Sequence, residues 1–136
     1  NKYTFNDTFT EFKKVERVIT NQVALTIEDI EKLLNHDFES KKLEKECSDY
    51  SLLVKSYGLQ IAKKVIQRLN ELESSSDLSV MSKIRSARLH KLSGDRSDEY
   101  AMDLTGNYRL IITSGDENIK LDQIKIVRIE KIEDYH

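Results

Sequence analysis

Basic and aromatic side chains that could act on a phosphodiester are concentrated in the second half of this 136-residue sequence. Arg and Lys stabilise the extra negative charge that builds up when a phosphodiester is attacked, and His or Tyr can move the protons. The candidates are Arg85, Arg88, His90, Lys91, Arg96, Arg109, Tyr135 and His136. These residue types predict a phosphodiester site, although charged residues on strand faces are more often simply solvated.

Arg109 differs from the other candidates in its sequence context. It follows Tyr108 and begins the most apolar run of the chain, so its stem is expected to lie against a sheet. A half-buried guanidinium needs an anionic partner. That partner is either structural, with Asp103 or Asp134 as candidates, or a substrate.

Other kinds of site are not indicated. The sequence has no catalytic triad signature, Gly-rich phosphate loop, paired-cysteine motif or HExxH motif. Its single cysteine, Cys47, and its three histidines have no metal-ligand spacing, so we expect no metal and no cofactor. No apolar run reaches about 18 residues and nothing marks export, so we expect a cytoplasmic protein without a membrane segment.

The charges are unevenly distributed along the chain. Residues 41–97 carry 12 basic and 7 acidic side chains, whereas residues 1–40 carry 5 and 8 and residues 98–136 carry 5 and 9. A basic middle between acidic ends is not typical of a strong non-specific DNA-binding protein. It suits a small local phosphate site.

The first part of the chain has apolar residues at helical intervals. Two short acidic helices are expected within residues 1–37, beginning near Thr8 and Thr26. Ser40 is a plausible N-cap for a further helix, which Tyr57-Gly58 interrupts. A brief strand is expected at residues 36–39.

The clearest helix follows Gly58 and ends at the serines 74–76. Its apolar stripe consists of Ile61, Val65, Leu69 and Leu72, and its outward side is expected to carry Lys63, Lys64, Gln67 and Arg68. Residues 41–73 should therefore form an antiparallel pair of helices, a helical hairpin.

After Arg85 the alternation changes to a period of two, which predicts strands. We expect them at residues 88–92, 99–105, 108–113 and 123–132. Gly106-Asn107 predicts a tight two-residue turn with positive φ, and the change of phase at Val127 predicts a bulge. Leu104, Leu110, Ile112 and Ile126 should join the core. Helices followed by an antiparallel meander make an α+β fold.

Three fragments occur in the order and spacing of a known group of proteins. Residues 88–96 read RLHKLSGDR, residues 106–111 read GNYRLI, and residues 133–136 read EDYH. They resemble the group's stretches RLHxLKGD, xNWRLIF and xxDYH. On these motifs residues 38–136 resemble the RelE/ParE superfamily of bacterial toxins, specifically its HigB group.

The resemblance implies a helical hairpin packed on an antiparallel sheet and the toxin half of a type II toxin–antitoxin pair. Such toxins cleave messenger RNA on the ribosome by attack of a ribose 2′-hydroxyl on the adjacent phosphate. The matching catalytic positions are His90, Arg109, Tyr135 and His136, with Arg85, Arg88, Lys91 and Arg96 as RNA-binding candidates. The implied partners are an antitoxin protein, the ribosome and messenger RNA.

The sequence departs from the group's pattern at two basic positions, which are Ser93 and Thr105 here. Lys91 is a candidate substitute for the first. The departures favour an alternative function: a non-catalytic or attenuated interaction protein on the same scaffold, such as a ParE-type gyrase inhibitor. Residues 1–37 would be an added segment that caps the fold, covers the basic site, or contacts another subunit or the antitoxin.

Overall fold

A computed structural model describes residues 35–116 and 118–135. The helices expected near Thr8 and Thr26, and most of the acidic segment 1–37, lie outside the described residues. The boundary expected between residues 37 and 38 falls inside the first described strand.

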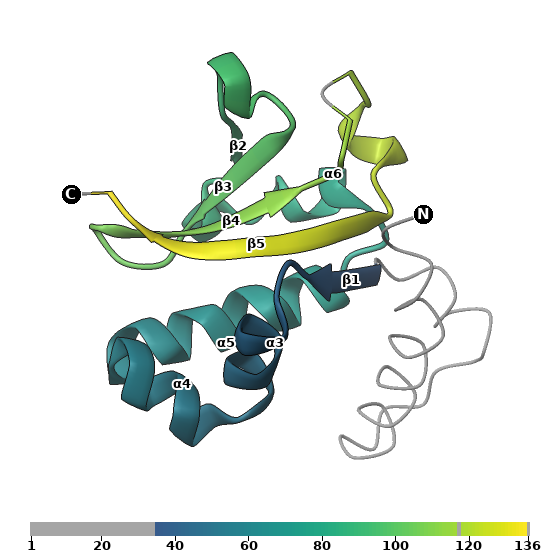
Figure 1. The fold of residues 1–136 in the computed structure, drawn as a ribbon. Coiled ribbons are helices and arrows are strands. Elements are labelled where there is room, and N and C mark those ends of the chain that lie inside the picture. Colours follow the sequence, from purple (N-terminus) through teal and green to yellow (C-terminus); the bar gives the residue numbers. More distant parts are fainter. Residues whose placement is uncertain (1–34, 117, 136) are drawn as a thin grey trace, which may run out of the picture.

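The described chain has an α+β fold around a five-stranded mixed sheet (Figure 1). The strand order is β1-β5-β4-β3-β2. Three of the neighbouring pairs in this order are antiparallel, but β1 runs parallel to β5. The strands are β1 (Asn35–Phe38), β2 (His90–Lys91), β3 (Glu99–Asp103), β4 (Tyr108–Thr113) and β5 (Ile126–Asp134). The expectation of a purely antiparallel sheet is therefore wrong at the β1 edge.

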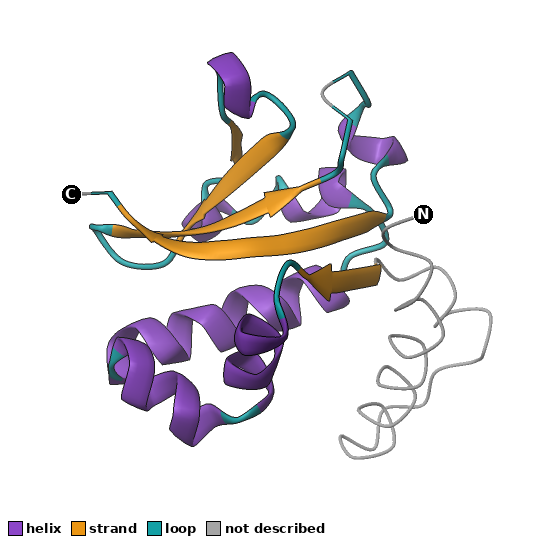
Figure 2. Cartoon of the chain, viewed as in Figure 1, coloured by secondary structure: helices purple, strands orange, loops and turns teal. Residues whose placement is uncertain are grey.

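Three helices replace the expected hairpin of two and lie together on one side of the strands (Figure 2). They are α3 (Lys41–Ser48), α4 (Tyr50–Tyr57) and α5 (Leu59–Glu73), followed by a short α6 (Leu78–Met81). The Ser40 hydroxyl accepts from the Leu43 N–H, as the N-cap prediction requires. Asp49 caps α4 in the same way, through the Leu52 N–H, and this second cap divides the first helix into two.

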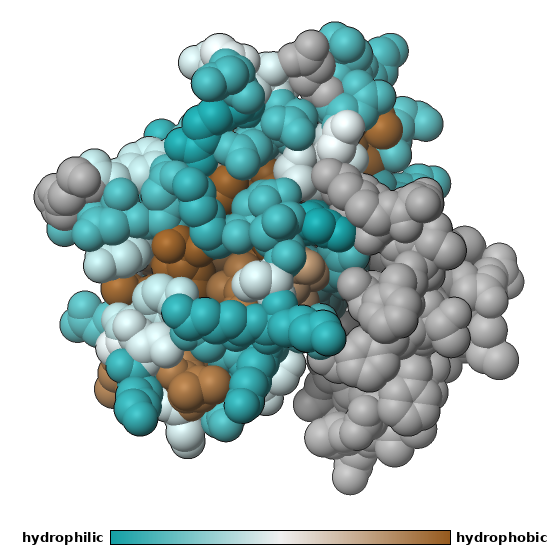
Figure 3. Space-filling model, viewed as in Figure 1, coloured by the Kyte–Doolittle hydropathy of each residue, from teal (hydrophilic) through white to brown (hydrophobic). Residues whose placement is uncertain are grey.

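The core lies between these helices and the sheet. Helix α5 contributes Val65, Leu69 and Leu72, and strand β4 contributes Leu110 and Ile112, all buried. Figure 3 shows mostly hydrophilic side chains on the face it displays, with hydrophobic ones gathered between the sheet and helix layers.

The register of β5 differs from the expected one. Val127 and Ile129 are buried, whereas Ile126 is only partly buried. The irregularity lies further along the strand, where Ile111 pairs with Lys131 but Ile112 pairs with Ile129, leaving Glu130 as the extra residue. The predicted bulge therefore exists but not at Val127. Ile61, expected in the core, is also only partly buried.

The connection from β3 to β4 is not the expected two-residue turn. The Leu104 N–H donates to the Tyr108 carbonyl over 3.0 Å, which leaves three residues in the loop. Neither Gly106 nor Asn107 has a positive φ. None of the described helices is long and apolar enough to span a bilayer.

Candidate functional site

Four of the charged or titratable side chains on the sheet project from the face opposite the helices. Residues paired directly across antiparallel strands share a face, and His90 pairs with Ala101 and Arg109 pairs with both Asp103 and Glu133. Ala101 and Asp103 are two residues apart and so share that face as well. We call this side, carrying His90, Asp103, Arg109 and Glu133, the outer face.

Asp103 lies between two arginines on the outer face. Arg88 forms a two-pronged bond to it, with Nε 2.8 Å from Oδ2 and Nη2 3.2 Å from Oδ1. Hydrogen bonding to Asp103, and then its charge, raise the pKa of the Arg88 guanidinium. Arg109 Nε lies 2.9 Å from Asp103 Oδ1 as an ion pair, but without the alignment of a hydrogen bond. Of the partners expected for Arg109, Asp103 is the one found.

Arg109 also holds the loop between β3 and β4. Its Nη1 donates to the carbonyls of Thr105 at 2.9 Å, Tyr108 at 3.0 Å and Gly106 at 3.3 Å. Only 12% of its side chain is exposed. In this arrangement Arg109 stabilises a loop and holds a carboxylate, which is a structural role in itself.

Tyr135 joins Arg109 from the end of β5. The centre of its ring lies 4.9 Å from the Arg109 Cζ, a cation–π contact. Its backbone N–H donates to the Asn107 carbonyl over 2.8 Å, and 43% of the residue is exposed. His136, the other terminal candidate, lies outside the described residues.

His90 is oriented by the backbone of Arg88. The His90 Nδ1 lies 2.8 Å from the Arg88 carbonyl oxygen. Because a carbonyl can only accept, Nδ1 carries the proton, and in the neutral ring Nε2 keeps its lone pair. Nε2 can therefore accept a proton from a ligand. We call Arg88, His90, Asp103, Arg109 and Tyr135 the arginine cluster.

The backbone of Arg88 adopts a left-handed conformation, with φ 45° and ψ 50°. It is the one non-glycine residue with positive φ in the described part of the chain. Such conformations cost energy in a residue with a long side chain and occur preferentially at functional sites. Here the turn directs the carbonyl of Arg88 toward His90 and its guanidinium toward Asp103.

Arg96 is neutralised separately from the cluster. Its guanidinium bridges Glu99, at 2.6 Å, and Glu133, at 3.0 Å, and so spans from β3 to β5. The hydrogen bonds that Arg96 donates to both carboxylates raise its pKa above the usual value for arginine. Lys131 approaches Glu133 within 2.9 Å. An RNA phosphate would have to replace one of these carboxylates to engage Arg96.

Two further RNA-binding candidates lie away from the cluster. Arg85 is exposed on a one-turn helix, residues Arg85–Ala87. Lys91 pairs with Tyr100 and so lies on the face of the sheet opposite His90, as expected for adjacent residues of a strand. Strand β2 ends at Lys91, so Lys91 and Ser93 do not share a strand and the spacing argument for substitution is not met.

One residue of this region was not predicted from the sequence. Arg68, expected to face outward, is 1% exposed. Its guanidinium donates over 2.8 Å to the Asp103 carbonyl, to the Ser86 carbonyl and to Glu71 Oε1. Arg68 therefore holds the backbone beside both Arg88 and Asp103. Its position three residues after Val65 and four before Leu72 was the available signal, because those intervals belong to the buried side of a helix.

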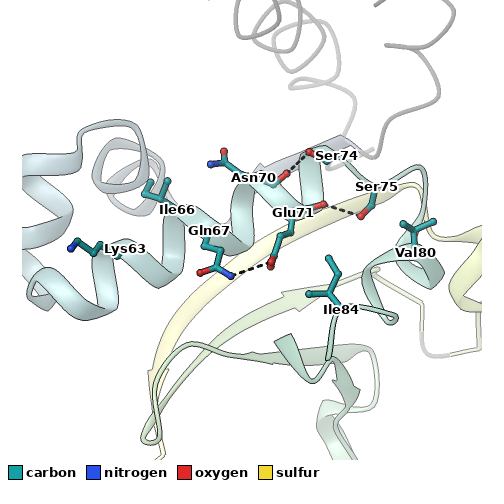
Figure 4. Close-up of a pocket in the computed structure, with 9 residues that line it drawn as sticks. All are labelled: Lys63, Ile66, Gln67, Asn70, Glu71, Ser74, Ser75, Val80 and Ile84. Carbon is teal, nitrogen blue, oxygen red and sulfur yellow. Dashed lines mark hydrogen bonds between the residues drawn. The ribbon is translucent and has the colours of Figure 1, made fainter. Parts of the chain in front are cut away.

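A groove runs along α5 beside α6 (Figure 4). It measures about 580 Å³ and has Ile66, Val80 and Ile84 among its walls. Gln67 donates to Glu71 Oε2 over 3.3 Å at its centre. None of the predicted site residues within 35–116 and 118–135 lines it.

No group of three potential metal ligands occurs among residues 35–116 and 118–135. Neither a model of a protein family nor a curated protein sequence matches the chain.

Proposed function

We propose that the chain is a ribosome-dependent messenger RNA endonuclease, the toxin of a type II toxin–antitoxin system, as its resemblance to the HigB group implies. The observation that carries the proposal is the orientation of His90. Its Nδ1–H is bound by the Arg88 carbonyl, which leaves Nε2 as a proton acceptor on the sheet face that also carries Arg109, and Asp103 joins Arg109 to Arg88. A base next to guanidinium groups is the arrangement that cleavage of RNA through its 2′-hydroxyl requires.

The reaction divides among these groups. One acceptor, His90 Nε2 or a terminal side chain, takes the proton of the ribose 2′-hydroxyl, and the 2′-oxygen attacks the adjacent phosphorus. The bond from phosphorus to the 5′-oxygen breaks, leaving a 2′,3′-cyclic phosphate. The departing 5′-oxygen receives a proton, for which Tyr135 and His136 are the candidates. Arg109 and Arg88 stabilise the negative charge that builds up on the phosphate.

The Asp103 carboxylate occupies the arginines that a phosphate would have to bind. Because its carboxylate is bound to both Arg88 and Arg109, a phosphate has to compete with it. The exposed side of Arg88 makes that competition feasible, since 59% of its side chain is accessible. A phosphate therefore binds Arg88 first, and it binds Arg109 only if it displaces the Asp103 carboxylate.

The alternative is a non-catalytic interaction protein on the same scaffold, of which a ParE-type gyrase inhibitor is one example. The contacts of Arg109 favour this non-catalytic function, because its guanidinium already contacts three carbonyls, one carboxylate and one aromatic ring. The residues Ser93 and Thr105, where the group has basic side chains, favour it as well.

Controlled expression in bacteria separates the two functions. The endonuclease proposal predicts growth arrest together with cut messenger RNA, and loss of both in His90→Gln and His136→Ala. Lys55→Gln, an exposed change on α4, is the control and should retain both effects. Growth arrest with intact messenger RNA, unaffected by His90→Gln, would establish the interaction protein instead.

A further inference from the structure

A pocket of about 730 Å³ lies beside the edge strand β2, between the end of α6 and the loop that precedes β5. It is lined by Ser79, Lys83, Leu89, His90, Lys91, Tyr100, Ile119, Lys120, Leu121 and Asp122. The lining combines three lysines and one aspartate with a wall of aliphatic side chains. It therefore suits a ligand that is negatively charged at one end and apolar at the other.

The tyrosine of this pocket provides a second observation. Tyr100 is 4% exposed, and its hydroxyl forms no hydrogen bond with any of the residues that the structure describes. The hydroxyl oxygen itself is not fully buried, because it reaches the surface of the pocket that Tyr100 lines. Burial raises the pKa of Tyr100, so the hydroxyl keeps its proton and can donate to a ligand.

Two lysines of the pocket, Lys83 and Lys120, contribute positive charge to it. Lys83 and Lys120 make no ion pair with a described residue, and Asp122 is the one carboxylate in the lining. Their local charge contrasts with the arginine cluster, where every guanidinium faces a carboxylate. A phosphate would thus be bound here without displacing an internal anion.

The pocket and the arginine cluster meet at His90, on the free edge of the sheet, because Tyr100 and Lys91 lie on the face opposite the cluster. His90 lines the pocket, and its ring is bonded to the Arg88 carbonyl of the cluster. Neighbouring strands lie about 4.8 Å apart, so β2 and β4 are separated by roughly 10 Å. An RNA strand whose reacting phosphate lies at the cluster would bring a neighbouring nucleotide to this pocket by passing over the edge strand β2.

We propose that the pocket bounded by Lys83, Tyr100 and Lys120 binds a nucleotide of single-stranded RNA next to the cleaved bond. This inference rests on the proposed function for its choice of ligand. The base lies against Leu89, Ile119 and Leu121, the Tyr100 hydroxyl donates to the edge of the base, and the lysines bind the backbone phosphate. Apolar contact with a base combined with phosphate binding by lysine is the usual mode of single-strand recognition.

The test measures binding of a fluorescent 2′-O-methyl RNA hexanucleotide, which has no free 2′-hydroxyl and cannot be cleaved. The variants are Lys83→Gln with Lys120→Gln, and separately Tyr100→Phe. The matched control is Lys55→Gln with Lys63→Gln, which removes the same charge from exposed helix positions. Far-ultraviolet circular dichroism and thermal unfolding of each variant establish that it is folded.

The lysine pair should lose affinity on the order of tenfold, and its plot of log affinity against log salt should become shallower by about 1.4. Tyr100→Phe should lose affinity about three- to tenfold with an unchanged salt slope. The control pair should keep most of the affinity. If the lysine pair and the control pair bind RNA equally well, the pocket is not an RNA subsite.

A second arm distinguishes RNA from a free nucleotide. AMP should bind weakly and be displaced by the hexanucleotide. If AMP binding depends on Lys83 and Lys120 while RNA binding does not, the pocket is a free-nucleotide site and the inference is overturned. If RNA binding depends on the lysines but ribosome-bound RNA is not cleaved, the subsite is supported and the endonuclease proposal is refuted. The two failures are therefore distinguishable.

Discussion

Arg68 Nε donates a 2.8 Å hydrogen bond to the backbone carbonyl of Asp103, 35 residues away. This bond links the middle of α5 to the end of β3, and the same guanidinium bonds the Ser86 carbonyl two residues before Arg88. A single buried side chain thus holds the backbone on both sides of the ion pair between Arg88 and Asp103.

Replacing Arg68 should therefore be costly. Arg68→Ala leaves two carbonyls without their donor and Glu71 without its cation, so we expect a loss of about 3–5 kcal/mol in the free energy of unfolding. Lys63→Ala on the exposed side of the same helix should change it by less than about 0.5 kcal/mol. Urea denaturation of both variants measures the difference, and equal losses would refute the buried role of Arg68.

Local signals in the sequence were enough to predict some elements but not others. Strand β4 was predicted with its observed bounds because it is a continuous β-branched and apolar run, and Ser40 was predicted as a cap because its side chain acts on the next turn only. The parallel pairing of β1 with β5 joins segments about 90 residues apart, so no local pattern reveals it.

The candidate site was less predictable for a related reason. Residue type suggested that Arg68 is exposed, but its burial is compensated by two hydrogen bonds to the backbone of other segments and one to Glu71 on the same helix. Likewise, the alternating pattern of residues 88–92 indicated a strand, whereas Arg88 takes a left-handed turn before β2. Tertiary hydrogen bonds outweigh local propensity at both places.

The register of β5 predicts unequal losses of stability when two of its isoleucines are truncated. Ile129 is fully buried against the helices, so Ile129→Ala should lower the free energy of unfolding by about 2–5 kcal/mol. Ile126 is partly buried, and Ile126→Ala should cost clearly less. Denaturation curves compare them directly. A larger loss in Ile126→Ala would show that the strand is shifted by one residue.

Cys47 should be unreactive in the folded protein. Burial, followed by the charge of Glu46, raises the pKa of its thiol to about 12 from an ordinary value of 9.0. At pH 8 the thiolate is then about 10³-fold scarcer than in the unfolded chain. Because the sequence has one cysteine, the rate of reaction with a chromogenic disulfide reports this thiol alone. Equal rates in native buffer and in guanidinium chloride would contradict the burial.

The ion pairs of Glu133 make the stability dependent on acid pH. Burial alone would raise the pKa of this carboxyl, but hydrogen bonds from Lys131 and Arg96, with their charges, hold it below 4.5. The resulting stabilisation is fully present above the unfolded-state pKa and is lost as the pH falls through the lower folded-state value. Glu133→Gln should therefore destabilise the protein at pH 7.

The difference in unfolding free energy between wild type and Glu133→Gln should shrink once the pH falls below about 4.5. Urea denaturation of both proteins at pH 7, 5 and 3 measures this difference. Asp95→Asn, on an exposed turn, is the control and should show little difference at any of these values. A difference that stays constant from pH 7 to pH 3 would mean that the Glu133 ion pairs do not stabilise the fold.

The chemistry of the RNA ends tests the central claim most directly. Purified protein is incubated with ribosomes carrying a defined messenger RNA, and the new 3′ ends are identified. The account predicts 2′,3′-cyclic phosphate ends for the wild type, produced about 10²–10⁴ times more slowly by His90→Gln. Intact RNA with the wild type, or cleavage that His90→Gln leaves unchanged, would contradict it.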